Sequence, residues 1–141
     1  MRPSAPGFAK HPDYQVEIIP TADRVRILAG DNILADTTRP LRVTESRHHP
    51  VWYLPMEDVA DSLLTKTSHS TYCPFKGEAS YWSIHTATTA LENAVWGYEN
   101  PFVECEPLME HVAFYTDRVA LEVNGEIQST QGPGWVDRTQ S

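Results

Sequence analysis

Positive charge and cysteine are the two things that this sequence has little of. It carries 11 lysines and arginines against 19 aspartates and glutamates, for a formal net charge of −8. Nucleic-acid binding normally depends on a basic face that neutralises phosphates, so this balance argues against DNA or RNA as a partner. The two cysteines, Cys73 and Cys105, are too few for a disulfide framework, and we expect both to be free thiols.

Long apolar runs are also missing. No segment approaches the ~20 apolar residues that a membrane-spanning helix needs. The N-terminal residues 1–13 lack the apolar core of a signal peptide. We therefore expect no membrane association and a cytoplasmic location.

What the sequence does contain is typical of one β-rich domain. Hydrophobic residues make up 40% of its 141 positions, which is enough for one core. Eleven prolines and seven glycines favour short strands joined by turns. We expect an extended arm over residues 1–13, a single domain over residues 14–127, and a mobile tail over residues 128–141, in which Trp135 is able to dock.

Alternating apolar and polar residues predict most of the strands. The Gly30-Asp31-Asn32 cluster predicts a tight turn that needs positive φ. The strands at 24–27, 33–35 and 41–44 follow one another within roughly 25 residues, which predicts an antiparallel meander. Further strands are expected at positions 14–19, 51–54, 81–85, 112–115 and 119–123.

Two segments have the period of a helix instead. In 56–64, Met56, Val59, Ala60, Leu63 and Leu64 would share one helical face. We therefore expect the clearest helix of the protein there. A second, short helix is expected from Thr89 to Gly97, because Thr89-Ala90-Leu91-Glu92 fits a capping box and Gly97 suits a helix end.

The stretch from His69 to Trp82 concentrates the reactive side chains. Cys73-Pro74-Phe75-Lys76-Gly77 reads as a turn, and Lys76 is one of only three lysines. Lys76 can present its ammonium to an anionic ligand or act as an amine nucleophile. Alternatively, it pairs with Glu78 or another carboxylate and orders the loop. Cys73 is either a thiolate activated by His69 or Lys76, or a small buried apolar residue, which is the commoner outcome.

Large aromatic residues are dense around this stretch. They either wall a pocket for a planar or cationic ligand, or form a core at whose edge the tyrosine hydroxyl and indole N–H groups find hydrogen-bond partners. The predicted ligand-binding set is Tyr53, His69, Thr71, Cys73, Lys76, Tyr81, Trp82, Trp96 and Tyr98. Glu45 is a candidate general base or the partner that neutralises Lys76.

Five phrases in register resemble one protein family. They are VWYLP (51–55), T-x-C-P-F-K-G (71–77), A-x-Y-W (79–82), ENAVWGYENP (92–101) and HVAFY (111–115). Together with their spacing, they make the chain similar, over roughly residues 22 to 125, to the bacterial and fungal family called domain of unknown function 427. The resemblance implies a compact, antiparallel β-tent-like domain of two small sheets with one or two short helices.

The same resemblance leaves the activity open, although the family is sometimes labelled nucleotidyltransferase-like. No P-loop pattern supports that label in this chain. Related β-tent proteins often hold zinc between two Cys-x-x-Cys pairs, and this chain has no such pair. His48 and His49 are adjacent and would point to opposite faces of a strand, so we expect no metal and no cofactor.

Three functional hypotheses follow. In the first, which we favour, the protein binds a small polar or anionic ligand in an aromatic-walled pocket around residues 69–82, with Lys76 contacting an anionic group. In the second, it is a transferase or hydrolase that uses Lys76, Cys73 and Glu45. In the third, it is a structural β domain that forms a homodimer through exposed edge strands such as 14–19.

Overall fold

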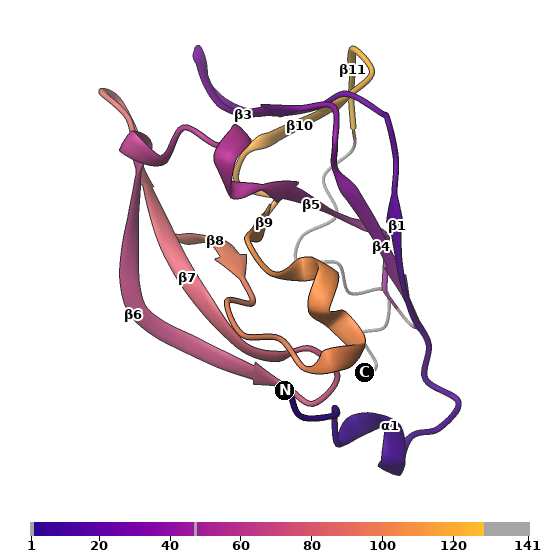
Figure 1. Cartoon of the computed structure of the whole chain (residues 1–141). Helices are drawn as coiled ribbons and strands as arrows, with labels where there is room; N and C mark the ends of the chain where they lie inside the picture. The colour runs from indigo at the N-terminus through magenta and orange to yellow at the C-terminus, as the bar shows by residue number, and fades with distance from the viewer. Residues whose placement is uncertain (1, 47, 129–141) are drawn as a thin grey trace.

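The computed structural model describes residues 2–46 and 48–128, and in them the chain is mainly β, with two antiparallel sheets (Figure 1). The strand order is β1–β4–β5–β9–β8–β7–β6 in a seven-stranded sheet and β11–β10–β2–β3 in a four-stranded one. The larger sheet contains β1 (Val16–Pro20), β4 (Leu41–Glu45), β5 (Val51–Pro55), β6 (Leu64–Cys73), β7 (Gly77–His85), β8 (Ala90–Gly97) and β9 (His111–Phe114). The smaller sheet contains β2 (Val25–Ala29), β3 (Asn32–Thr37), β10 (Ala120–Val123) and β11 (Glu126–Ile127).

Helical segments are short in this part of the chain. They are α1 (Gly7–Lys10), η1 (Met56–Asp58), η2 (Asp61–Leu63) and η3 (Val103–Leu108). The predicted mainly β fold with two antiparallel sheets and short helices is therefore confirmed, while the tent subtype stays a prediction. Within residues 2–46 and 48–128, no helix has the length and apolar character required to span a bilayer. The expected docking of Trp135 falls outside the described residues.

The predicted meander is only half right. β2 and β3 form the expected hairpin, and Gly30 takes the positive φ (60°) that its turn needs. However, β4 does not continue this hairpin, because it pairs with β1 and β5 in the other sheet. Local alternation predicts that a strand forms, but the partner depends on which hydrophobic core its buried side chains join.

The helix predicted over residues 56–64 is wrong. Only the two 3₁₀ turns η1 and η2 form, and between them Val59 is extended (φ −108°, ψ 141°). Val59 makes an antiparallel bridge to Ala35, and the Ala60 amide donates to the Leu34 carbonyl at 2.8 Å. Hydrogen bonds to β3 have thus replaced the intrahelical ones, and Leu64 begins β6.

The helix predicted from Thr89 to Gly97 is also wrong, because Ala90–Gly97 form β8 between β7 and β9. Val95 pairs with Trp82 and Leu91 with Ile84, so a step of four positions along β8 faces a step of two along β7. Asn93 absorbs the extra length with a positive φ of 52°. This irregularity spaces the apolar residues three and four apart and so imitates a helical period.

Two hydrophobic cores lie on opposite faces of the larger sheet. Strand alternation separates them: Leu54, Val95 and Val112 join the core between the two sheets. Tyr53, Trp96 and Ala113, each next to one of these three in the chain, join the other core. The second core, which we call the aromatic core, contains Leu41, Val43, Tyr53, Ala79, Tyr81, Trp96, Tyr98, Cys105, Leu108 and Ala113. Its members Cys105 and Leu108 come from η3, the orange coil of Figure 1.

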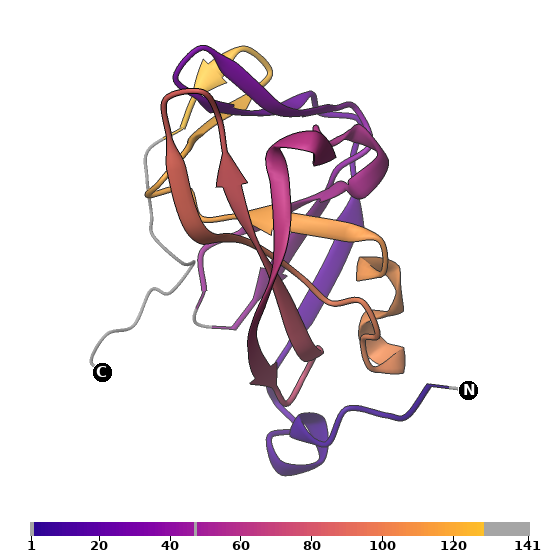
Figure 2. The same cartoon turned by 90° about the vertical axis from the view of Figure 1, so that its left-hand side faces the viewer.

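The N-terminal segment packs against the tip of the β6–β7 hairpin, where α1 lies in both views (Figures 1 and 2). The Gly7 amide donates to the Pro74 carbonyl at 2.9 Å, and the Phe8 ring meets the Phe75 ring edge-on at 5.0 Å. A Cβ on Gly7 would lie 2.7 Å from the Phe75 ring and 2.9 Å from the Pro74 carbonyl oxygen, so a larger residue there requires both the ring and the backbone to shift.

Candidate functional site

Lys76 lies in the predicted turn at the tip of the β6–β7 hairpin and forms a buried ion pair with Glu45. Their side chains are only 6% and 8% exposed. The second carboxylate oxygen of Glu45 accepts a hydrogen bond from the Tyr14 hydroxyl, and His48 Nε2 lies 4.0 Å from it. Of the two interpretations of Lys76, the structure shows the carboxylate pair, with Glu45 rather than the exposed Glu78 as the partner.

The N-terminal arm closes over this ion pair. The Tyr14 ring stacks on Phe75, with centroids 3.9 Å apart and planes 13° apart. Because Phe75 precedes Lys76 and Tyr14 bonds Glu45, the stack ties the arm to both partners of the pair. Burial also lowers the pKa of the neighbouring His48 imidazole, and it outweighs the Glu45 carboxylate, which favours the protonated form.

The predicted aromatic residues do not form one wall. Tyr53, Tyr81, Trp96 and Tyr98 belong to the aromatic core, where the Trp96 indole donates to the Tyr53 hydroxyl at 3.1 Å. Burial raises the pKa of the Tyr53 and Tyr98 phenols, which therefore stay protonated. Trp82, the chain neighbour of Tyr81, packs against the core on the other face of the sheet. Adjacent residues of a strand point to opposite faces, so these two rings cannot line the same pocket.

The remaining predicted residues lie along β6 and at its end. His69 is exposed and sits edge-on to the Tyr81 ring at 4.5 Å, and the exposed Thr71 shares a 3.0 Å hydrogen bond with the Tyr81 hydroxyl. Cys73 and Cys105 are free thiols, half-buried and buried respectively. Burial raises the pKa of the Cys105 thiol to about 11, so it is an unreactive core residue at neutral pH.

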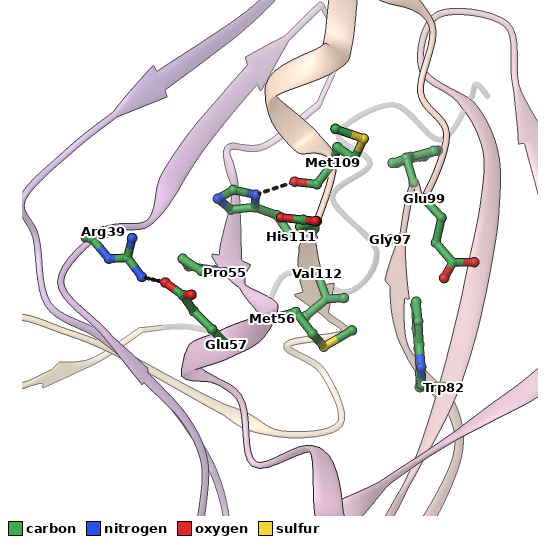
Figure 3. A pocket seen from close by; sticks show the side chains of 12 residues that line it. Arg39, Pro55, Met56, Glu57, Trp82, Gly97, Glu99, Met109, His111 and Val112 are labelled. Carbon is green, nitrogen blue, oxygen red and sulfur yellow. Dashed lines mark hydrogen bonds and ion pairs between the residues drawn. The ribbon is translucent and has the colours of Figure 1, made fainter.

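A groove of about 660 Å³ lies on the other face of the larger sheet, beside η1 (Figure 3). Its apolar lining includes Pro55, Met56, Trp82, Met109 and Val112. Its charged and polar lining consists of Arg39, Glu57, Glu99, Glu110 and His111, and Gly97 and Tyr98 complete it. Concave sites of this size with a few converging polar groups are typical of small-molecule sites.

Close contact between β8 and β9 shapes this groove. A Cβ on Gly97 would lie 2.8 Å from the His111 carbonyl oxygen and 3.1 Å from Val112 Cγ1, so only glycine fits without a shift. Glu110 adopts a left-handed backbone (φ 66°), and its carbonyl accepts the Met56 amide at 2.9 Å. This bond fixes η1 beside the start of β9.

Ion pairs occupy both rims of the groove. Arg39 donates to Glu57 and lies 3.5 Å from Asp58. On the opposite rim, Glu99 accepts hydrogen bonds at 2.7 Å from Lys66 and at 2.7 Å from Ser80. These bonds, that of Lys66 above all, hold the pKa of the Glu99 carboxyl below its ordinary value, so it is ionised at neutral pH.

Of the predicted ligand-binding residues, only Trp82 and Tyr98 line the groove. Sequence reasoning missed Arg39, Met56, Glu110 and His111, which come from distant segments with no common period. The one available indication was that His111 opens HVAFY (111–115), one of the segments that carry the family resemblance. In residues 2–46 and 48–128, no three His, Cys, Asp or Glu side chains are grouped so as to hold a metal ion.

Comparison with known proteins identifies the family of the chain. No curated protein matches the chain. One family model, described as a domain of unknown function (DUF427), matches residues 17–125, which is most of the chain and nearly all of the described strands. The chain therefore belongs to the DUF427 family, as its five sequence phrases predicted.

Proposed function

We propose that the protein is a small-molecule binding domain whose ligand occupies the groove between η1 and strands β7 to β9. The observation that supports this proposal is the groove itself, which has a volume of about 660 Å³ and both apolar and charged lining residues. That volume lies within the range of roughly 300–1,000 Å³ that ligand pockets of proteins occupy. Trp82 keeps part of the predicted aromatic site on the face of the sheet opposite the aromatic core, and Tyr98, a member of that core, borders the groove.

The groove is a better candidate than the surroundings of Lys76. An anion at Lys76 would have to displace the Glu45 carboxylate and the arm that stacks through Tyr14. Breaking a buried ion pair is strongly unfavourable, because it leaves one charge buried without its partner. The transferase or hydrolase hypothesis meets the same obstacle, since each group holds the other and neither is available as nucleophile or base.

A matched pair of tryptophan variants tests the proposal. Trp82 and Trp52 both pack, half-buried, against the core between the sheets, but Trp82 lines the groove and Trp52 does not. Wild type, Trp82→Ala and Trp52→Ala are screened by thermal shift against amines, nucleotides, sugar phosphates, carboxylates and uncharged aromatics. A compound at a hundredfold its dissociation constant stabilises by about 2.7 kcal/mol, which is several degrees for this size.

The expected result is at least one compound that raises the midpoint of wild type and Trp52→Ala, each relative to its own unliganded value, but not that of Trp82→Ala. Compounds that shift all three proteins equally would place the ligand elsewhere. No shift with any compound would refute the binding function. Self-association through β1, an edge of the larger sheet, stays a prediction that sedimentation can test.

A further inference from the structure

The hydrogen-bonding groups of the groove are mainly acceptors. His111 Nδ1 lies 3.0 Å from the Met109 carbonyl oxygen, which can only accept, so Nδ1 carries the proton and donates it. In the neutral ring Nε2 is then a bare acceptor. Figure 3 shows this second nitrogen turned away from Met109, toward the side of the groove where Arg39 and Glu57 lie.

The cations beside the groove are already paired. Arg39 is held by Glu57 and Asp58, and Lys66 by Glu99 at 2.7 Å. Arg2, whose guanidinium donates to the Met109 sulfur, lies 3.6 Å from Glu106. Glu110 adds a further exposed carboxylate at the start of β9.

The lining therefore has an excess of negative charge. It holds the carboxylates Glu57, Glu99 and Glu110 against the single guanidinium of Arg39, a net charge of −2 with neutral histidine. Including the partners Asp58 and Lys66 leaves this net charge unchanged. A complementary ligand brings hydrogen-bond donors and positive charge.

The apolar lining suits the same kind of ligand. The half-buried Trp82 offers an indole, whose ring face attracts cations more strongly than that of any other side chain. The thioethers of Met56 and Met109 are polarisable and adapt to irregular apolar groups. An inorganic cation would leave this apolar surface unused, whereas an organic one would cover it.

We propose that the ligand of the groove is an organic cation, an amine or amidine carried on a small apolar or aromatic body. The ammonium lies at the start of β9, beside His111 Nε2 and Glu110, and the apolar body covers Trp82 and the two methionines. This assignment rests on the proposed function of the groove. It also predicts that nucleotides and other phosphate-bearing compounds are poor ligands, because their negative charge would face three carboxylates.

Two probes with one apolar body and opposite charge test the assignment. Phenethylamine and 3-phenylpropionate are titrated separately into the full-length ¹⁵N-labelled protein, and the tryptophan indole N–H resonances are followed by NMR. The Trp82 signal is identified by its loss in Trp82→Phe. Phenethylamine is expected to move this signal in a saturable way and to leave that of Trp52 in place, whereas 3-phenylpropionate moves neither.

A carboxylate variant supplies the control for charge. Glu110→Gln is expected to weaken phenethylamine binding about tenfold, the usual scale for one charge-assisted hydrogen bond. Glu126→Gln, which removes an exposed carboxylate on β11, should leave the affinity unchanged. Raising the salt concentration should weaken binding in wild type more than in Glu110→Gln.

The outcomes separate this assignment from the proposed function. If 3-phenylpropionate, or an anion from the thermal-shift panel, bound at Trp82 as tightly as phenethylamine or more tightly, the ligand would not be a cation. The groove would remain the binding site. An affinity for phenethylamine that is unchanged in Glu110→Gln would also overturn the assignment. If neither probe and no compound of the panel affects Trp82, the proposed function fails together with the assignment.

Discussion

Breaking the Lys76–Glu45 pair should be costly, and the structure indicates how costly. In Lys76→Met the thioether fills most of the space of the lysine side chain, while Glu45 stays only 8% exposed and loses its ion pair. Removing one partner of a buried pair typically costs about 3–5 kcal/mol. Because the Tyr14 hydroxyl still donates to Glu45, we expect the lower end of that range, about 3 kcal/mol. For a chain of this size, this loss corresponds to a fall of roughly 10 °C in the unfolding midpoint.

Urea unfolding of four proteins measures the effect: wild type, Lys76→Met, Glu45→Gln and the double variant. The double variant should be more stable than the sum of the single effects predicts, with a coupling energy of about 2 kcal/mol, because no unpaired charge remains buried. Lys66→Met provides the control, since the Lys66–Glu99 pair is 53% and 47% exposed. Pairs of that kind contribute about 0–1 kcal/mol.

The reasoning would be refuted if Lys76→Met were no more destabilising than Lys66→Met, or if the coupling energy were near zero. Either result would mean that the Lys76–Glu45 pair is open to water in solution. An anionic ligand at Lys76 would then become a credible hypothesis again.

Three further predictions concern single side chains. Burial lowers the pKa of His48 below its ordinary 6.5, so the unfolded chain binds this proton at a higher pH than the folded one does. The free energy of unfolding should therefore fall as the pH drops from about 6.5 toward the folded-state pKa. In urea midpoints measured between pH 7.5 and 5.5, His48→Gln should remove this part of the decline. Iodoacetamide at pH 8 should label Cys73 well before Cys105, whose thiol is buried with its pKa raised to about 11, and peptide mass spectrometry showing equal labelling would contradict this. Gly7→Ala should loosen the arm, because its Cβ would lie 2.7 Å from the Phe75 ring and 2.9 Å from the Pro74 carbonyl oxygen, and faster amide exchange over residues 2–14 should report it. The exposed Lys10→Ala serves as the control, and unchanged exchange in Gly7→Ala would show that the ring and the hairpin tip can move aside.

Much of the β architecture could be predicted from the sequence because strand alternation is a local property. The Gly30 turn and the hairpin turn at residues 73–77 were recognisable from residue type alone. Both predicted helices failed for a common reason, since the backbone groups of 56–64 and 89–97 find partners in other strands. Those partners decide between helix and strand when the local pattern is ambiguous.

The candidate site was predictable only in part. Glu45 was recognised as a potential partner of Lys76, although 31 residues separate the two in the sequence. The aromatic cluster, in contrast, was expected as one wall, and strand alternation assigns Tyr81 and Trp82 to opposite faces. The groove could not be predicted at all, because its lining runs from Arg39 to Val112 and no local pattern connects them.

The sequence by itself thus determined the family, the mainly β fold, the excess of acidic residues and the turn that carries Lys76. These properties follow from composition and from patterns shorter than about ten residues, which act before any long-range contact forms. The tertiary structure decided which strands pair, that Lys76 is neutralised by Glu45, and that η1, β8 and β9 enclose a groove. The reason is physical: strand partners, buried ion pairs and cavities depend on distances between segments far apart in the chain, which only the packed core fixes.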